Sequence, residues 1–175
     1  MPKYLEEFNP PIRLLLGPGP SNVNPRVLQA MSAPLLGHLD PAFLDIMDDV
    51  RDMLRIVFKT KNEITLPISG TGSAGMETAI VNVIEPGDTM VVGINGYFGD
   101  RIAQIGERSG ATVARVNADW GLPLDPDKLN EELKKHKRVK AVAMVHAETS
   151  TGVRSPAKEI TALAHDHDAL VIIDT

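Results

Sequence analysis

The 175-residue sequence contains no cysteine, which excludes disulfide bonds, thiolate metal sites and a cysteine nucleophile within this chain. Aromatic residues make up only 4% of it, and no apolar run approaches the roughly 18 to 20 residues that span a bilayer. Acidic residues outnumber basic ones by 23 to 18, so charge favours neither nucleic acid nor an anionic membrane as a partner. Any chemistry must therefore use groups other than a thiol.

Hydrophobic residues at 43% and charged residues at 23% are typical of a globular domain with one core. The N-terminal residues are too acidic and too interrupted by proline for a signal peptide, so we expect a cytoplasmic protein. His165 and His167 stand two positions apart in a helix-like segment, and this spacing points them away from each other. We therefore expect no metal site.

From Glu63 onward, strand-like and helix-like segments alternate, which predicts an α/β fold with a mostly parallel sheet and flanking helices. The expected strands span residues 64–68, 89–94, 112–116, 139–145 and 169–173. One helix is expected over residues 76–84, where apolar positions recur at helical spacing. Three more should begin where a capping side chain precedes proline, after Asp40, Asp125 and Ser155. Residues 1–40 show no period, and we interpret them as an N-terminal extended arm.

Gly70, Gly72 and Gly75 form a G-x-G-x-x-G pattern after the first expected strand, which is the context of a dinucleotide-binding fingerprint. That fingerprint also needs an acidic residue at the end of the next strand, where this sequence has Asn95. Glycines before a helix more generally expose backbone N–H groups to a phosphate. An NAD-linked oxidoreductase domain, another phosphate-binding loop and a turn without a ligand all remain open at this point.

Five segments, taken in order, narrow the choice. They are GPGPSNV (17–23), SGTGSAGMETA (69–79), NGYFGDR (95–101), HAETSTGV (146–153) and ALVIID (169–174). Together they resemble the class V aminotransferases, which are pyridoxal 5′-phosphate enzymes of fold type I, and within them the alanine–glyoxylate and serine–pyruvate group. The resemblance implies that residues 41–175 are the N-terminal part of the coenzyme-binding large domain. The remainder of that domain and the small domain would be absent.

The resemblance also implies roles for individual residues. Thr71, Gly72 and Ser73 would hold the phosphate of pyridoxal 5′-phosphate. Phe98 would stack on the pyridine ring, and the Thr149 hydroxyl would face the hydroxyl side of that ring. These five residues would form the coenzyme-binding set together with a carboxylate at the end of the chain.

That carboxylate is Asp174, which the resemblance places against the pyridine nitrogen as the catalytic residue of this chain. A carboxylate at a strand end in a site of low dielectric would stabilise the protonated nitrogen, and the ring accepts electrons well only in that form. The Schiff-base lysine of the resembling enzymes lies after this strand, beyond Thr175, and is not in this chain.

The implied function is transfer of an amino group from a small amino acid, alanine or serine, to a 2-oxo acid such as glyoxylate. The resembling enzymes commonly share their sites between two subunits, so a homodimer is expected. Because the lysine is missing, the chain looks truncated and inactive by itself. Two alternatives are retained: an NAD-linked oxidoreductase domain, and a non-catalytic fragment that binds phosphate.

Overall fold

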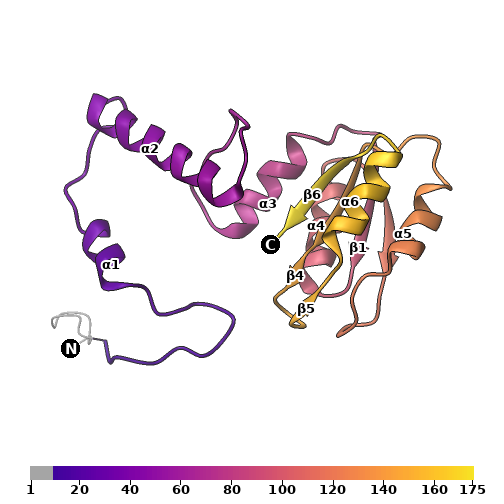
Figure 1. Cartoon of the computed structure of the whole chain (residues 1–175), viewed down its shortest axis with the longest axis horizontal. Coiled ribbons are helices and arrows are strands. Elements are labelled where there is room, and N and C mark those ends of the chain that lie inside the picture. The colour runs from indigo at the N-terminus through magenta and orange to yellow at the C-terminus, as the bar shows by residue number, and fades with distance from the viewer. Residues whose placement is uncertain (1–9) are drawn as a thin grey trace. The chain divides into compact units, whose positions relative to one another are not determined.

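The computed structural model describes residues 10–175, which divide into two units between Thr65 and Leu66 (Figure 1). The first unit holds two helices, α1 (Pro25–Met31) and α2 (Pro41–Phe58). α1 starts at Asn24, whose side chain accepts a hydrogen bond from the backbone N–H of Arg26. The segment expected to be extended therefore contains a short helix, because seven residues are too few to show a helical period.

α2 begins as the sequence predicts. The Asp40 side chain accepts from the backbone N–H of Ala42 at 2.9 Å, and proline occupies the first turn. At its other end, Arg55 donates to the carbonyl oxygens of Asn62 (3.0 Å) and Glu63 (2.8 Å), which fixes the chain that leaves the helix.

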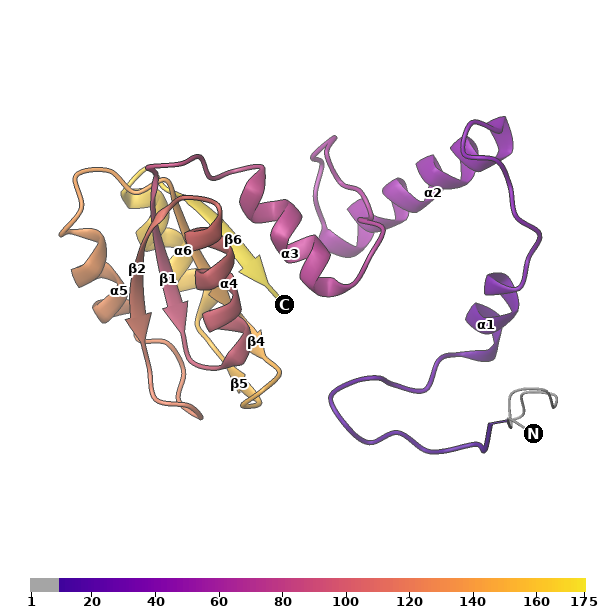
Figure 2. The ribbon, with the colours of Figure 1, turned by 180° about the vertical axis from the view of Figure 1, so that it is seen from behind.

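A parallel sheet of four strands forms the centre of the second unit (Figure 2). Its strands are β1 (Thr89–Ile94), β2 (Thr112–Asn117), β3 (Ala141–Val145) and β6 (Leu170–Asp174), and they lie in the order β2-β1-β3-β6. A two-stranded antiparallel hairpin, β4 (Ala147–Glu148) with β5 (Val153–Arg154), follows β3. Four of the five expected strands and the parallel α/β fold are thus confirmed.

The fifth expected strand, residues 64–68, does not form. Ile64 is 86% exposed, and the backbone N–H of Thr65 bonds only locally, to the carbonyl of Glu63 at 3.0 Å. A strand is stabilised by the ladder of a neighbouring strand. Within residues 10–175 no strand pairs with this segment, so its alternating apolar residues are not sufficient.

Helices cover both faces of the sheet. α3 (Gly72–Val81) and α4 (Tyr97–Arg108) pack on one face, and α5 (Pro126–Leu133) and α6 (Ala157–Asp166) pack on the other. Figure 1 looks onto the face that α6 covers, and Figure 2 looks onto the face that α4 covers. The strands alternate accordingly: Met90 and Val92 of β1 belong to the first core layer and Val91 to the second.

Capping by Asp125 at the start of α5 is confirmed, since its side chain accepts from the backbone N–H of Asp127 at 2.9 Å. Capping by Ser155 is wrong, because α6 begins at Ala157 and has no side-chain cap. The Ser155 hydroxyl is buried and accepts instead from the Asn95 side chain (3.2 Å) and the Leu124 backbone (3.3 Å). It joins two loops and is therefore not available to the helix.

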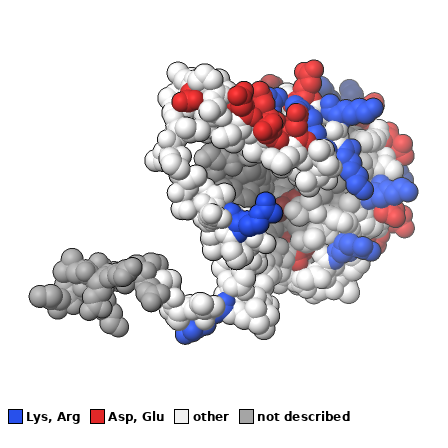
Figure 3. Space-filling view, turned by 60° about the vertical axis from the view of Figure 1, so that its left-hand side comes forward, with Lys and Arg blue, Asp and Glu red and all other residues white. Residues whose placement is uncertain are grey.

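No helix within residues 10–175 is long and apolar enough to cross a membrane. In the same residues, no group of three or more His, Asp or Glu side chains could hold a metal ion. Acidic and basic side chains lie next to one another on the face that Figure 3 shows, rather than in separate fields of one sign.

Candidate functional site

The carboxyl ends of the parallel strands all lie at one edge of the sheet. The chain passes from β1 through α4 to β2 on one side of β1, and then through α5 to β3 on the other side. The connections therefore diverge between β1 and β3, which is where open α/β sheets bind their ligands. Phe98 follows β1, Thr149 follows β4, which comes shortly after β3, and Asp174 is the last residue of β6.

The three glycines of the loop before α3 differ in what they do. Gly70 has φ of 151°, and a Cβ atom there would lie 2.8 Å from the Cβ of Ala74, so the turn itself requires glycine. A Cβ at Gly72 or Gly75 would meet nothing within 4 Å. The fold therefore does not explain glycine at these two positions.

The N-terminus of α3 leaves hydrogen-bond donors free. Thr71 is the N-cap residue and its side chain makes no capping bond, although its carbonyl accepts from Ala74 (2.9 Å) and Gly75 (3.3 Å). Among residues 10–175, the backbone N–H groups of Gly72 and Ser73 have no acceptor. Two free N–H groups at the positive end of a ten-residue helix, with open space at Gly72, suit a phosphate group.

The same geometry disfavours a dinucleotide. The glycine loop does not follow a strand, because residues 64–68 have no ladder partner. Asn95 stands at the end of β1, where the fingerprint needs an acid, and it is completely buried. Its side-chain amide donates to the Leu122 carbonyl (3.1 Å) and to Ser155 (3.2 Å), so it is part of the structural framework.

Phe98 lies in the first turn of α4 and is half-buried against the core layer that α3 and α4 share. Its ring meets that of Tyr97 edge to face, with centroids 5.2 Å apart. Thr149 is exposed, and no residue within 10–175 forms a hydrogen bond with its hydroxyl. Both side chains are therefore available to a ligand at this edge of the sheet.

Glu148 is not among the site residues predicted from the sequence, although its place after an apolar run indicates a fixed hydrogen-bonding role. It is only 1% exposed, and its carboxylate accepts from the backbone N–H groups of Phe98 (3.4 Å) and Gly99 (3.2 Å) at the start of α4. The same carboxylate accepts from the backbone N–H (3.1 Å) and hydroxyl (2.6 Å) of Ser150. The signal in the sequence was a glutamate three residues after a buried apolar strand, where a carboxylate needs hydrogen-bond partners if it is buried.

Asp174 pairs in register with Val145 of β3, and its carbonyl accepts from the backbone N–H of His146 at 2.7 Å. The side chain is half-buried, and burial raises the pKa of its carboxyl group. The negative charge of Glu148 raises that pKa further. No Lys or Arg within the described residues forms an ion pair with Asp174, so a cation beside it would favour its ionised form.

The structure relates three of the predicted residues to Glu148, whereas it relates the glycine loop to them only through the packing of α3. Phe98 and Thr149 lie on segments that the Glu148 carboxylate joins, and Asp174 is close enough to sense that charge. α3 contacts both α4 and β6, which places the glycine-loop helix against the same elements. No hydrogen bond links residues 71–73 to the other three side chains in the described part of the chain.

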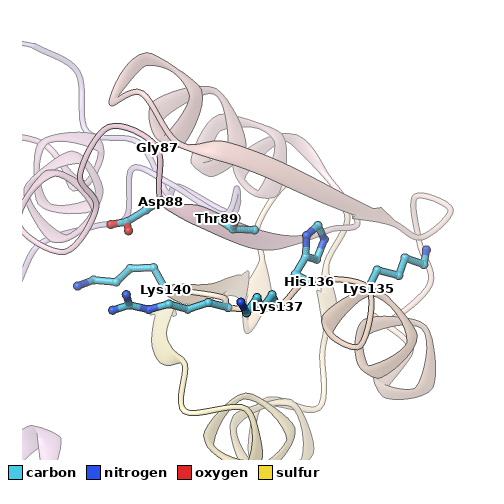
Figure 4. Close-up of a pocket in the computed structure, with 8 residues that line it drawn as sticks. Gly87, Asp88, Thr89, Lys135, His136, Lys137 and Lys140 are labelled. Atoms are coloured by element: carbon cyan, nitrogen blue, oxygen red, sulfur yellow. The ribbon is translucent and has the colours of Figure 1, made fainter.

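A cavity of about 420 Å³ lies at the opposite, amino edge of the sheet and holds none of the predicted residues (Figure 4). Its lining is mostly basic: Gly87, Asp88, Thr89, Lys135, His136, Lys137, Arg138 and Lys140. Two of these residues already have a partner, because Glu132 binds Lys135 at 2.7 Å and His136 at 3.0 Å. In Figure 4, Lys135 points away from the side to which Lys140 and Asp88 extend. The volume alone therefore does not mark the functional site.

Comparison with known proteins shows the family to which the chain belongs. The model of the family described as Aminotransferase class-V matches residues 13–175. The (S)-ureidoglycine–glyoxylate transaminase of Bacillus subtilis is 46% identical over 168 residues, which are 96% of this chain and 40% of that protein. The alanine–glyoxylate aminotransferase of Callithrix jacchus is 41% identical over 171 residues, which are 98% of this chain and 41% of that protein.

A solved structure gives the same result. The crystal structure of an alanine–glyoxylate aminotransferase from Nostoc sp. superposes with a TM-score of 0.93 at 46% identity, over 97% of this chain and 45% of that one. The present chain thus spans about 40% of the length of its curated relatives. The family uses pyridoxal phosphate, and the fold is that of its fold type I enzymes. The chain therefore belongs to the class V aminotransferase family and is similar to its alanine–glyoxylate group.

Proposed function

We propose that this chain supplies the coenzyme-binding part of a pyridoxal 5′-phosphate-dependent aminotransferase. The observation that carries the proposal is the composition of the carboxyl edge of the sheet. Two unpaired N–H groups at the start of α3 suit a phosphate, and the half-buried Asp174, with no cationic partner in residues 10–175, suits a protonated ring nitrogen. The two demands match the two charged ends of one coenzyme.

When bound, pyridoxal phosphate supplies an electron-accepting ring that the side chains of a protein lack. The residues of this chain bind and orient that ring. Gly72 and Ser73 donate backbone N–H groups to the phosphate, and the Thr71 hydroxyl adds a donor. Phe98 covers one face of the ring, while the Thr149 hydroxyl faces the ring hydroxyl.

Asp174 acts on the ring nitrogen, where it holds the proton. The negative charge of Glu148 acts on the Asp174 carboxyl group and raises the pKa of that group, so a cation beside Asp174 is favoured. A neutral nitrogen would leave Asp174 half-buried and without a partner. The pair of carboxylates therefore favours the form of the ring that withdraws electrons most strongly.

Glyoxylate is the acceptor that the relatives suggest. The printed names of the Bacillus subtilis and Callithrix jacchus proteins share glyoxylate and differ in the amino donor, which is ureidoglycine in one and alanine in the other. We therefore propose a 2-oxo acid such as glyoxylate as acceptor and a small amino acid, alanine or serine, as donor. A homodimer is part of the same proposal.

A measurement of coenzyme-analogue binding tests the proposal, because the lysine to which the enzymes of the family attach their coenzyme is expected beyond Thr175. Calorimetric titration with 4′-deoxypyridoxine 5′-phosphate, which lacks the aldehyde and cannot react with stray lysines, should show one site. NAD should not bind. Tight NAD binding together with no binding of the analogue would contradict the proposal.

Turnover requires a longer chain. We expect that fusing the C-terminal part of the Nostoc relative after Thr175 yields a protein in which borohydride fixes pyridoxal phosphate to one lysine, which mass spectrometry identifies. The 175-residue chain should show no such specific attachment and no transamination of alanine with glyoxylate. Binding without turnover in both proteins would support the alternative of a non-catalytic phosphate-binding fragment.

A further inference from the structure

The start of α4 is capped by a side chain from a distant part of the sequence. Gly96 is the N-cap residue of α4 and offers no side chain of its own. Glu148 takes that place, since its two carboxylate oxygens accept from the N–H groups of Phe98 and Gly99. A carboxylate at a helix N-terminus is stabilised by both hydrogen bonding and the helix dipole.

The same carboxylate also holds the turn that follows β4. One of its oxygens accepts from the backbone N–H and the hydroxyl of Ser150, and the Ser150 hydroxyl oxygen in turn accepts from the backbone N–H of Tyr97 at 2.9 Å. Three hydrogen bonds thus connect the first turn of α4 to the turn at residues 148–152, and two more within that turn hold Ser150 against Glu148. Figures 1 and 2 both show β4 beside α4, and the two elements are in contact.

The side chains of this connection pack closely against Gly96. A Cβ atom on Gly96 would lie 2.6 Å from the Ser150 hydroxyl oxygen and 2.5 Å from the carboxyl carbon of Glu148. Glu148 itself is 1% exposed. A buried carboxylate that accepts four hydrogen bonds from two segments is held in place by both of them, so it can fix the position of one segment relative to the other.

We propose that Glu148 is a positioning residue that fixes Phe98 and Thr149 relative to each other for the ring of the coenzyme. This inference rests on the proposed function. Phe98 is the residue whose N–H the carboxylate accepts, and Thr149 stands between Glu148 and Ser150, the two residues of the connection. A shift of the Phe98 backbone would break its bond to this side chain, and a shift of the turn that carries Thr149 would break the bonds that Ser150 makes to it.

The charge of Glu148 gives it a second effect on the same ligand. It raises the pKa of the Asp174 carboxyl group, and it therefore strengthens the preference of that carboxylate for a cationic partner. Both effects act on the ring of the coenzyme. Neither acts on the phosphate, which the α3 N-terminus binds by separate donors.

Because both effects concern the ring and not the phosphate, the inference can be tested by comparing a ligand that has the ring with one that has only the phosphate. Glu148→Gln keeps the size of the side chain but removes the charge and replaces one acceptor oxygen with a donor. We expect the affinity for 4′-deoxypyridoxine 5′-phosphate to fall by about tenfold or more, as charge-assisted hydrogen bonds are lost around the ring. The affinity for inorganic phosphate, measured by ³¹P NMR, should stay within about twofold because the α3 donors are unchanged.

Glu132→Gln is the matched control, since Glu132 belongs to the second unit but lies on α5 and binds Lys135 and His136, which follow that helix. It should leave both affinities unchanged. Ser150→Ala removes only the hydroxyl from the connection and should weaken binding of the analogue by a few-fold, which keeps the inference testable if Glu148→Gln fails to fold.

The outcomes distinguish the inference from the proposed function. If the parent chain binds the analogue no more tightly than inorganic phosphate, the ring contributes nothing and the proposed function fails. If the parent prefers the analogue, and Glu148→Gln and Ser150→Ala leave that preference intact, only the positioning role of Glu148 is refuted. An equal loss of both affinities in a folded Glu148→Gln variant would also refute it, because a general distortion would then be the cause.

Discussion

Gly72→Val separates the contribution of the glycine loop to folding from its contribution to binding. A Cβ atom at Gly72 meets nothing within 4 Å in the coenzyme-free chain, so the added valine side chain has space. Valine is also slightly better than glycine inside a helix, by a few tenths of a kcal/mol. We therefore expect the free energy of unfolding to change by less than about 0.5 kcal/mol.

The effect on binding should be much larger. A valine at position 72 would place its side chain in the open space at the start of α3, beside the free N–H groups of residues 72 and 73, where we expect the phosphate. Hydrogen bonds to a charged group contribute about 1.5 to 3 kcal/mol each, so the loss of two costs about 3 to 6 kcal/mol. Since 1.4 kcal/mol is tenfold, the affinity for 4′-deoxypyridoxine 5′-phosphate should fall by roughly 10² to 10⁴.

Calorimetric titration measures the affinity, and thermal unfolding followed by circular dichroism measures the stability. Ala79→Val is the control, because Ala79 is an exposed residue of the same helix, two turns beyond the N-terminal donors. It should bind as the parent chain does. If Gly72→Val binds the analogue normally, the phosphate does not sit at the α3 N-terminus. If it unfolds at a much lower temperature, the glycine is a structural requirement that the open space does not reveal.

Three further predictions concern stability. Asp174→Asn should raise the thermal midpoint of the coenzyme-free chain at neutral pH, because burial and Glu148 raise the carboxyl pKa and so make the ionised form costly. The gain should shrink as pH falls through that raised pKa, because the parent side chain then becomes neutral too. A midpoint difference independent of pH would contradict this prediction. Gly70→Ala should lower the free energy of unfolding in urea by about 1 to 3 kcal/mol, since φ of 151° and the contact with Ala74 both oppose a side chain. An unchanged urea midpoint would show that the turn adjusts to the added methyl group. Arg115→Gln should lower the free energy of unfolding by at most about 1 kcal/mol at neutral pH, because the ion pair that lowers the pKa of Asp100 is partly exposed. That ion pair stabilises the chain above the ordinary aspartate pKa, and its contribution is lost as pH falls through the lowered pKa. The difference in stability between variant and parent should therefore vanish in acid.

The sequence alone was sufficient to predict those structural features that depend on residues close together in the chain. Asp40 and Asp125 each precede proline, and both side chains cap the helices that follow. The apolar runs at residues 89–94 and 141–145 became central strands because strands covered on both faces need apolar side chains all along their length. These features depend on neighbours in the sequence, and a pattern can therefore predict them.

Where a distant group decides the structure, the same rules failed. Ser155 precedes proline just as Asp40 does, but its hydroxyl is bound to Asn95, which lies 60 residues earlier. Residues 64–68 have the composition of a strand and lack a partner within the described residues. Composition cannot show whether a partner is present, because pairing depends on the rest of the fold.

The candidate site also depends on a contact between residues that are far apart in the sequence. The segments NGYFGDR and HAETSTGV were quoted as separate motifs, yet their glycine and glutamate occupy one space: the Glu148 carboxylate lies where a side chain on Gly96 would be. Each residue is understandable only with the other, since Gly96 cannot cap α4 and Glu148 cannot be buried without the free N–H groups there. A substitution at either position should therefore alter both segments together. This coupling explains why two short motifs, about 50 residues apart, behave as a single element of the candidate site.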